Sequence, residues 1–246
     1  MTWTRTALLA ALLPLVAGVS ARAAPAITVY TENWPPFNFE KDGRVDGVAT
    51  AIVRKVLGEA GLDYDILVRP WTRAYANALS DPNAMIYSMV RTKEREALFK
   101  WAVPLARLDL YLFGARNGTT VASVADLAKS DFTATCIIDD ASCATLESIG
   151  IRPDNIERVP DNETGSEIQM VVTGRTDFYV AEPIANTYRL QQMGLDPTAV
   201  VPILRVSNDR VLYLAGNLKM DPTVADRIQK ALARLVARGA VPAVGK

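Results

Sequence analysis

Short apolar runs alternate with amphipathic segments along most of the chain. The runs are rich in β-branched residues and end at turn or proline signals, which predicts strands over 27–30, 64–69 and 84–90. Apolar residues recur at helical spacing over 48–60, and a shorter helical pattern over 73–79 has Thr72 as its expected N-cap. This β-α-β-α-β order favours a parallel sheet with helices on both faces.

A second series of the same kind follows a strand predicted over 108–115. Its expected strands are 132–138, 156–159 and 177–181, and its expected helices are 139–149, 163–173 and 184–192. Strand-like segments over 200–206 and 210–215 precede a long amphipathic helix that starts at Asp221-Pro222 and ends at Gly239. No Gly/Ser linker separates the two series. We therefore expect two lobes joined by strands, with residues 24–109 and 209–246 in lobe 1 and residues 110–208 in lobe 2.

The first 23 residues have the features of a secretion signal. Arg5 precedes an apolar run over 7–19, and Ala21 and Ala23 form the A-x-A pattern of a signal-peptidase site. The run is short for a membrane span and contains Pro14, which favours cleavage over anchoring. We expect a signal peptide over residues 1–23 and an exported protein in the periplasm, with a retained N-terminal anchor as the alternative.

Composition excludes several classes of function. The chain has no histidine, which excludes Ser-His and Cys-His nucleophiles and imidazole metal sites. Its 27 basic and 27 acidic residues leave no net charge, and no basic run suggests a nucleic acid partner. We expect no metal, no cofactor and no catalytic residue. Cys136 and Cys143 are the only cysteines, and in an exported protein they favour a disulfide over two reduced thiols.

Candidate binding residues follow the predicted strands of the first series. Ligands of parallel α/β sheets bind beyond the carboxyl ends of the strands, and six side chains with suitable chemistry lie there: Glu32, Trp34, Trp71, Ser88, Arg91 and Arg95. A helix expected over 93–99, with Thr92 as its N-cap, would join the two guanidiniums in binding a small anion. The alternative is a solvated helix face with weak ion pairs to Glu94 and Glu96.

An ordered set of motifs gives the chain a resemblance to a known family. The set is Tyr30-Thr-Glu-x-Trp-Pro-Pro-Phe37, Asp46-Gly-Val48, Ser88-x-x-x-Thr92-x-x-Arg95, Trp101-x-x-Pro104, Gly174-Arg-x-Asp177 and Glu182. In this order the motifs resemble the family 3 periplasmic solute-binding proteins that serve amino-acid ABC transporters, over nearly the whole mature chain. The resemblance implies a two-lobe α/β periplasmic binding protein fold (type II). Each lobe would be a mainly parallel sheet flanked by helices, with the ligand cleft between the lobes.

The resemblance also implies a function and roles for the candidate residues. A monomer without enzymatic activity would capture an amino acid or related small carboxylate by lobe closure and deliver it to a membrane ABC permease. In the family, the arginine at the Arg95 position holds the ligand carboxylate with help from the Ser88 position. Acidic residues at the Glu32 and Glu182 positions hold its ammonium group, and aromatic residues at the Trp34 and Trp71 positions sandwich the side chain.

Three departures from the family pattern place this chain in a divergent subgroup. Val90 replaces a usual Ser or Thr, Arg91 adds a cation, and Asp139-Asp140 replaces the usual anion-binding loop of the second lobe. Asp140 is therefore also a candidate binding residue.

Alternatives remain for the residues and for the function. Trp34 and Trp71 could be core aromatics, and Glu182 before Pro183 could be only a helix N-cap. A periplasmic enzyme similar to cyclohexadienyl dehydratase would use Glu32 or Glu182 as a general acid. A sensory module for a membrane receptor is the third candidate.

Overall fold

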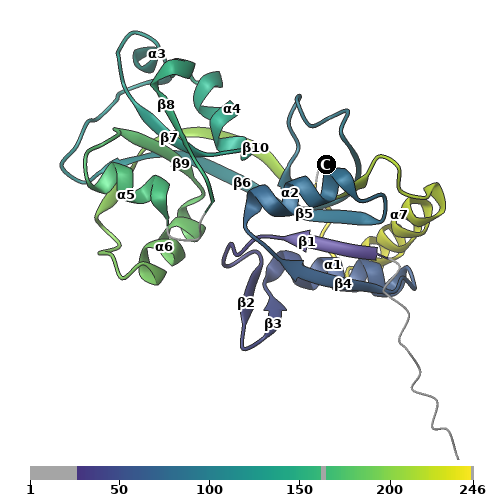
Figure 1. Cartoon of the computed structure of the whole chain (residues 1–246). Helices are drawn as coiled ribbons and strands as arrows, with labels where there is room; N and C mark the ends of the chain where they lie inside the picture. Colours follow the sequence, from purple (N-terminus) through teal and green to yellow (C-terminus); the bar gives the residue numbers. More distant parts are fainter. Residues whose placement is uncertain (1–26, 162–164, 245–246) are drawn as a thin grey trace, which may run out of the picture.

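Two lobes joined by a pair of long strands make up the protein. The computed structural model describes residues 27–161 and 165–244, so the predicted signal peptide lies outside the described residues. Strands β6 (Phe99–Ala115) and β10 (Val200–Asn217) run antiparallel through both lobes (Figure 1). They are the central strands of an eight-stranded sheet with the order β4-β1-β5-β10-β6-β9-β7-β8. The predicted lobe boundaries fall inside these two strands and stay a prediction.

Lobe 1 contains the elements of the first series and the terminal helix. Strands β1 (Ile27–Thr31), β4 (Tyr64–Val68) and β5 (Ala84–Val90) are parallel. Helices α1 (Val48–Glu59) and α7 (Pro222–Ala237) pack together, and their apolar side chains share one core cluster, whereas those of α2 (Trp71–Ser80) belong to another. Every residue of β5 is buried, as expected for a strand that is covered by helices on both faces.

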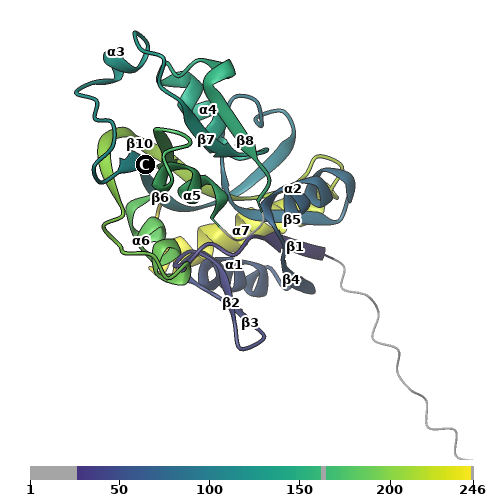
Figure 2. The same cartoon turned by 60° about the vertical axis from the view of Figure 1, so that its left-hand side comes forward.

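A short hairpin projects from lobe 1 in both ribbon views (Figures 1 and 2). It consists of β2 (Phe39–Lys41) and β3 (Arg44–Asp46), joined by a turn. Gly47, which follows the hairpin, has a φ of 119°, and a Cβ atom there would lie 2.3 Å from the carbonyl oxygen of Phe37. Only glycine allows this close approach. The hairpin and the start of α1 are thereby held against the loop that carries Trp34.

Lobe 2 repeats the arrangement of helices on both faces of parallel strands. Strands β7 (Ala134–Ile137), β8 (Ile156–Val159) and β9 (Phe178–Ala181) pair in parallel. One core cluster contains side chains from α3 (Val124–Leu127) and α4 (Ala141–Ser148). Another contains side chains from α5 (Ser166–Val172) and α6 (Pro183–Gln192). A 3-10 turn, η1 (Pro153–Asn155), leads into β8.

Two local predictions were wrong. Residues 93–98 form turns and Phe99 begins β6, so the helix expected over 93–99 is absent. A helix of seven residues has little stability of its own, and Phe99 instead pairs with Asn217 of β10. Pro70, not Thr72, is the N-cap of α2. The strand-like segments over 200–206 and 210–215 are confirmed as strand, and they are continuous in β10, with register shifts between them.

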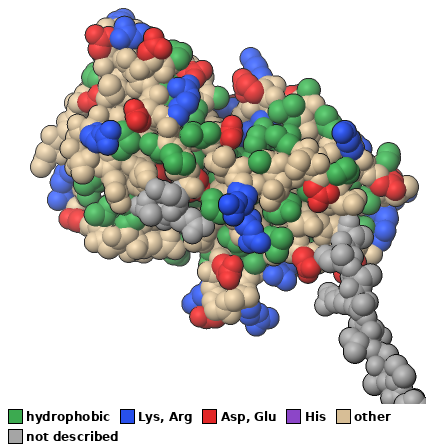
Figure 3. Space-filling view, in the orientation of Figure 1, with side chains coloured by type: hydrophobic (Ala, Val, Ile, Leu, Met, Phe, Trp, Pro, Cys, Tyr) green, Lys and Arg blue, Asp and Glu red, His purple; other side chains and the backbone are tan. Residues whose placement is uncertain are grey.

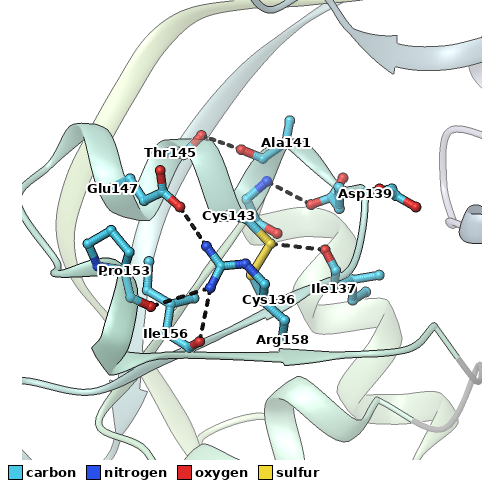
Figure 4. Close-up of a disulfide and its surroundings, with 12 residues drawn as sticks. Cys136, Ile137, Asp139, Ala141, Cys143, Thr145, Glu147, Pro153, Ile156 and Arg158 are labelled. Atoms are coloured by element: carbon cyan, nitrogen blue, oxygen red, sulfur yellow. Dashed lines mark hydrogen bonds and ion pairs between the residues drawn. A yellow bond between two sulfur atoms is a disulfide. The ribbon is translucent and has the colours of Figure 1, made fainter. Parts of the chain in front are cut away.

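A disulfide connects β7 to α4 (Figure 4). Cys136 and Cys143 are bonded, with their Cα atoms 5.2 Å apart. Arg158 braces the same part of lobe 2, because its guanidinium pairs with Glu147 at 2.6 Å and donates to the carbonyl oxygens of Pro153 and Ile156. The disulfide closes a short loop that contains Asp139 and Asp140. Among the helices of the described residues, none is long and apolar enough to span a bilayer.

Candidate functional site: a cleft between the lobes

A cleft of about 130 Å³ is lined by residues of both lobes and of the crossing strands. Its polar and charged lining is Glu32, Asn33, Ser88, Thr135, Asp140, Ser142, Asp161, Glu167, Tyr179, Glu182, Asn186 and Arg189, and its apolar lining includes Trp34, Trp71, Leu108 and Leu110. Six of the eight predicted binding residues therefore line one cavity: Glu32, Trp34, Trp71, Ser88, Asp140 and Glu182. Arg91 and Arg95 do not line it. The binding roles of all eight stay predictions.

A tight turn after β1 holds Glu32 and Trp34 at the cleft. Trp34 N–H donates to the carbonyl oxygen of Asn38 at 2.6 Å, and Phe37 N–H donates to that of Trp34 at 2.9 Å. The buried amide of Asn38 donates to the backbone oxygen of Glu32 at 2.7 Å. The Trp34 ring packs against Phe37, with 4.7 Å between their centroids. Both side chains are thus fixed by the backbone of the same loop.

Ser88 has an unusual conformation in the middle of a buried strand. Its φ is +61°, a value that non-glycine residues adopt at a cost. The side chain is only 3% exposed, and its Oγ has no hydrogen-bond partner. Burying an unpaired hydroxyl is unfavourable. Because Ser88 lines the cleft, this strained backbone presents an unsatisfied polar atom to it.

Asp140 and Glu182 both cap helices at the cleft. Asp140 accepts a hydrogen bond from Ser142 N–H at 2.8 Å, at the start of α4. Glu182 accepts one from Ala185 N–H at 2.7 Å, at the start of α6. The N-cap interpretation of Glu182 is therefore confirmed. Each carboxylate uses one oxygen for its cap while its residue also lines the cleft, so capping and ligand contact are compatible.

Carboxylates of the two lobes interact with one another and with Arg189 across the cleft. Burial raises the pKa of the Glu32 carboxyl well above its ordinary value, and the charges of Asp161 and Asp140 raise it further, whereas Arg189 and Arg95 lower it. Burial likewise raises the pKa of Glu167, which Arg189 opposes. Arg189 lies 3.9 Å from Asp161, with both side chains largely buried. The charge of one arginine is therefore shared among several acids.

Arg95 and Trp71 of lobe 1 bind the loop of lobe 2 between β7 and α4. The Trp71 indole N–H donates to the carbonyl oxygen of Asp139 at 2.9 Å, and the Arg95 Nη2 donates to the same oxygen at 2.5 Å. The Trp71 backbone N–H donates to Asp161 Oδ2 at 2.7 Å. We call these three hydrogen bonds the cross-lobe contacts. They hold the lobes in a closed arrangement.

The guanidinium of Arg95 makes hydrogen bonds to two backbone carbonyl oxygens and contacts two aromatic rings. Its Nη1 donates to the carbonyl oxygen of Val90 at 3.0 Å, and its side chain lies between the Trp71 and Tyr75 rings, 5.1 and 5.3 Å from their centroids. Arg95 is 5% exposed. Thr92 Oγ1 accepts a hydrogen bond from its backbone N–H, which keeps a capping contact although no helix forms. Arg95 is thus next to the cleft but turned toward the main chain.

Arg91 lies outside the cleft. Its guanidinium pairs with both carboxylate oxygens of Glu96 and lies 5.5 Å from the Trp101 ring centroid and 5.7 Å from that of Tyr213. The hydrogen bonds to Glu96 raise its pKa above the ordinary value. These contacts match the weak surface ion pair that was the alternative to anion binding.

Sequence reasoning missed three charged residues of the cleft: Asp161, Glu167 and Arg189. Asp161 follows the carboxyl end of β8, so the rule that selected Glu32 and Ser88 could have found it. Glu167 is in the first turn of α5 and Arg189 in the last turn of α6. No local pattern distinguishes these two from ordinary helix surface.

The fold and the interlobe cleft define the class of two-lobe solute-binding proteins. The sequence matches the family of bacterial extracellular solute-binding proteins, family 3, over residues 27–244, and the chain belongs to that family. No curated protein matches it.

Solved structures share its fold at low sequence identity. A histidine kinase sensor domain with similarity to periplasmic binding proteins is 17% identical, with a TM-score of 0.74 over 87% of this chain and 92% of that chain. The arginine-, lysine-, histidine-binding protein ArtJ from Geobacillus stearothermophilus is 17% identical, with a TM-score of 0.71 over 87% of this chain and 90% of that chain. The amino acid ABC transporter substrate-binding protein AbpA from Streptococcus pneumoniae is 16% identical, with a TM-score of 0.69 over 87% of this chain and 90% of that chain.

Proposed function

We propose that this protein is a periplasmic substrate-binding protein that captures a small polar solute between its lobes and delivers it to a membrane ABC permease. A signal peptide over residues 1–23 would direct its export, and the protein would act as a monomer. The solute would be an amino acid or a related small polar molecule. Family membership and the ArtJ and AbpA structures support this proposal.

The observation that carries the proposal is the cleft itself. Polar side chains from both lobes converge on one small cavity, and the cross-lobe contacts of Trp71 and Arg95 close it. A pair of lobes that closes over a polar cavity suits capture and release by hinge motion. The outer surface carries dispersed charges of both signs on the face shown in Figure 3. The ligand-sized cleft, not a charged surface, is therefore the feature that specifies function.

A thermal-shift screen of small polar solutes, followed by X-ray scattering, tests the proposal. A cognate solute should raise the melting temperature in a concentration-dependent way and reduce the radius of gyration. Trp34→Ala, in the cleft wall, should abolish the shift. Tyr188→Ala, on the exposed face of α6, should keep it. If no solute stabilises the wild-type protein and its radius of gyration never changes, the proposal is wrong.

A sensory role is the second candidate, and its support is the likeness to the histidine kinase sensor domain. Both roles need the same capture step and differ in the membrane partner. Crosslinking the solute-loaded protein in membranes of its own bacterium and identifying the captured protein separates them. A permease subunit supports transport, whereas a receptor kinase supports sensing.

The raised pKa of Glu32 favours an enzyme, because a general acid needs a pKa above that of an ordinary carboxyl group. The acidic lining disfavours an anionic substrate of the prephenate type. Incubation with candidate acids and product analysis tests this role. Turnover would refute a function limited to binding.

A further inference from the structure

Carboxylates dominate the charge of the cleft. Glu32, Asp140, Asp161, Glu167 and Glu182 line it, whereas Arg189 is the single basic side chain of its described lining. Asp161 and Glu32 both interact with that arginine, as does Glu167. Five acidic side chains thus share the lining with Arg189, and Arg95, outside the lining, lowers the pKa of Glu32 less than Arg189 does. A bound cation would favour the ionised forms of Glu32 and Glu167, whose pKa values burial raises in the free protein. The cavity therefore attracts cations and repels anions.

Most of the donors that could bind a ligand carboxylate are already used by the protein. The backbone N–H groups of Ser142 and Ala185, at the starts of α4 and α6, donate to Asp140 and Glu182. The backbone N–H of Trp71 donates to Asp161. Arg95 donates to two backbone carbonyl oxygens and does not line the cleft. The N-termini of α4 and α6 are thus occupied by the protein itself, and Arg189, whose buried Nε has no hydrogen-bond partner, is the cation of the described lining that could still meet an anion.

Acceptors, in contrast, remain available. Within the described residues, the Glu32 carboxylate accepts no hydrogen bond, and the Glu167 carboxylate accepts one only from its own backbone N–H. Ser88 supplies an independent sign of a missing partner, because its Oγ is buried, unpaired and in the cleft wall. A hydroxyl oxygen and two carboxylates can each accept a hydrogen bond from an ammonium or guanidinium group. Leu108, Leu110 and Trp34 offer apolar surface for an alkyl chain.

We propose that the solute is an organic cation with two or more amine or guanidine charges, recognised through Glu32, Glu167 and Ser88 without need of a carboxylate group. This inference rests on the proposed function and narrows its substrate class. The acidic lining supplies the attraction, and each ligand N–H satisfies an acceptor that the protein leaves open. A linear diamine fits this chemistry, with charged ends and an apolar middle. Neutral and acidic amino acids lack the second positive charge that balances the lining.

Isothermal titration of the exported protein with four probes on one carbon skeleton tests the inference. The probes are 1,4-diaminobutane, ornithine (the same diamine with a carboxylate), norvaline (which lacks the second amine) and glutamate. 1,4-Diaminobutane should bind at least about tenfold more tightly than norvaline or glutamate, a difference of about 1.4 kcal/mol. Its affinity should match or exceed that of ornithine, and added salt should weaken it.

Matched variants assign the binding to the named acids. Glu32→Gln should weaken 1,4-diaminobutane about tenfold or more while the free protein keeps its circular dichroism spectrum. Glu40→Gln, on the exposed β2–β3 hairpin, changes the same charge far from the cleft lining and should leave the affinity unchanged. Glu167→Gln is the second cleft variant, should the first fold poorly.

Two results would overturn the inference. One is binding of ornithine tenfold or more tightly than 1,4-diaminobutane, or of norvaline or glutamate more tightly than the diamine. The other is an unchanged affinity in both cleft variants. If all four probes fail but another solute of the thermal-shift screen binds, the inference is wrong and the proposed function stands. If no solute binds at all, the proposed function itself is wrong.

Discussion

Replacing Arg95 with methionine separates two roles for this residue. Methionine keeps much of the length and apolar surface of the side chain but removes the positive charge and both hydrogen bonds. The hydrogen bond to Val90 is within lobe 1, so its loss affects open and closed forms equally. The hydrogen bond to Asp139 crosses the lobes, and its loss destabilises only the closed form. Arg95→Met should therefore shift the balance between the two forms.

The size of that shift follows from the cross-lobe bond. A hydrogen bond from a charged donor contributes about 1.5–3 kcal/mol, which corresponds to a factor of about 10 to 150 in an equilibrium constant. Because the bound solute requires closed lobes, the apparent affinity should fall equally for every ligand, by up to this factor, which is reached in full when the free protein is mostly open. Isothermal titration with ornithine and with 1,4-diaminobutane measures this factor for a ligand with a carboxylate and one without.

The control is Arg91→Met, which removes an exposed ion pair with Glu96 and should leave both affinities unchanged. Equal losses for the two ligands in Arg95→Met support a role in lobe closure. A loss confined to ornithine would refute this reasoning, because it would show that Arg95 binds the ligand carboxylate directly, as the family resemblance implies.

Three further predictions concern the cleft and the disulfide. The folded protein keeps the proton of Glu32 at pH values where the unfolded chain has lost it. The free energy of unfolding, measured by urea denaturation, should therefore fall as pH rises from the ordinary carboxyl pKa of 4.5 toward the raised pKa of folded Glu32. Glu32→Gln should make the free energy of unfolding depend less on pH in this range. Ser88→Ala removes an unpaired buried hydroxyl and should stabilise the free protein by about 1–3 kcal/mol while weakening solute binding. A destabilised protein with unchanged binding would contradict a role for the Ser88 hydroxyl in contacting the solute. Replacing Cys136 and Cys143 by alanine removes the closed loop and should cost about 2.5 kcal/mol, or a melting temperature lower by about 5–10 °C in calorimetry; an unchanged melting temperature would refute this estimate.

The fold could be predicted because its strands carry a clear signal. β5 is apolar at nearly every position since helices cover both faces, and the helices flanking it show one apolar stripe each. The same regularity predicted Glu32 and Ser88 as cleft residues, since strand ends of a parallel sheet lie along one edge, whereas Glu182 was predicted from the family resemblance. The helix predicted over 93–99 was wrong because the pairing of β6 with β10 is a long-range contact, which local periodicity cannot indicate.

Other features of the site depend on how the lobes meet. Arg95 was predicted to bind the ligand, and its sequence position could not show that it lies outside the cleft lining and donates to the carbonyl oxygen of Asp139 in the other lobe. Asp161, Glu167 and Arg189 interact with one another within lobe 2, and Glu32 of lobe 1 joins them across the cleft. The acidic character of the cavity therefore comes from residues that are far apart in the sequence, and charge patterns along the chain do not show it.

Strands β6 and β10 have a mechanical consequence. Their register is irregular where they pass between the lobes, with shifts between Arg205 and Ser207 and between Ser207 and Arg210. Leu108 and Leu110 of the facing strand belong to the same stretch and also line the cleft. A solute in the cleft therefore rests against the pivot of the two lobes. We expect a displacement of a fraction of an ångström at this pivot to grow with distance along each lobe, as at the tips of a pair of tongs. The outer rims of the lobes would then move much farther than the residues of β6 and β10 that contact the solute.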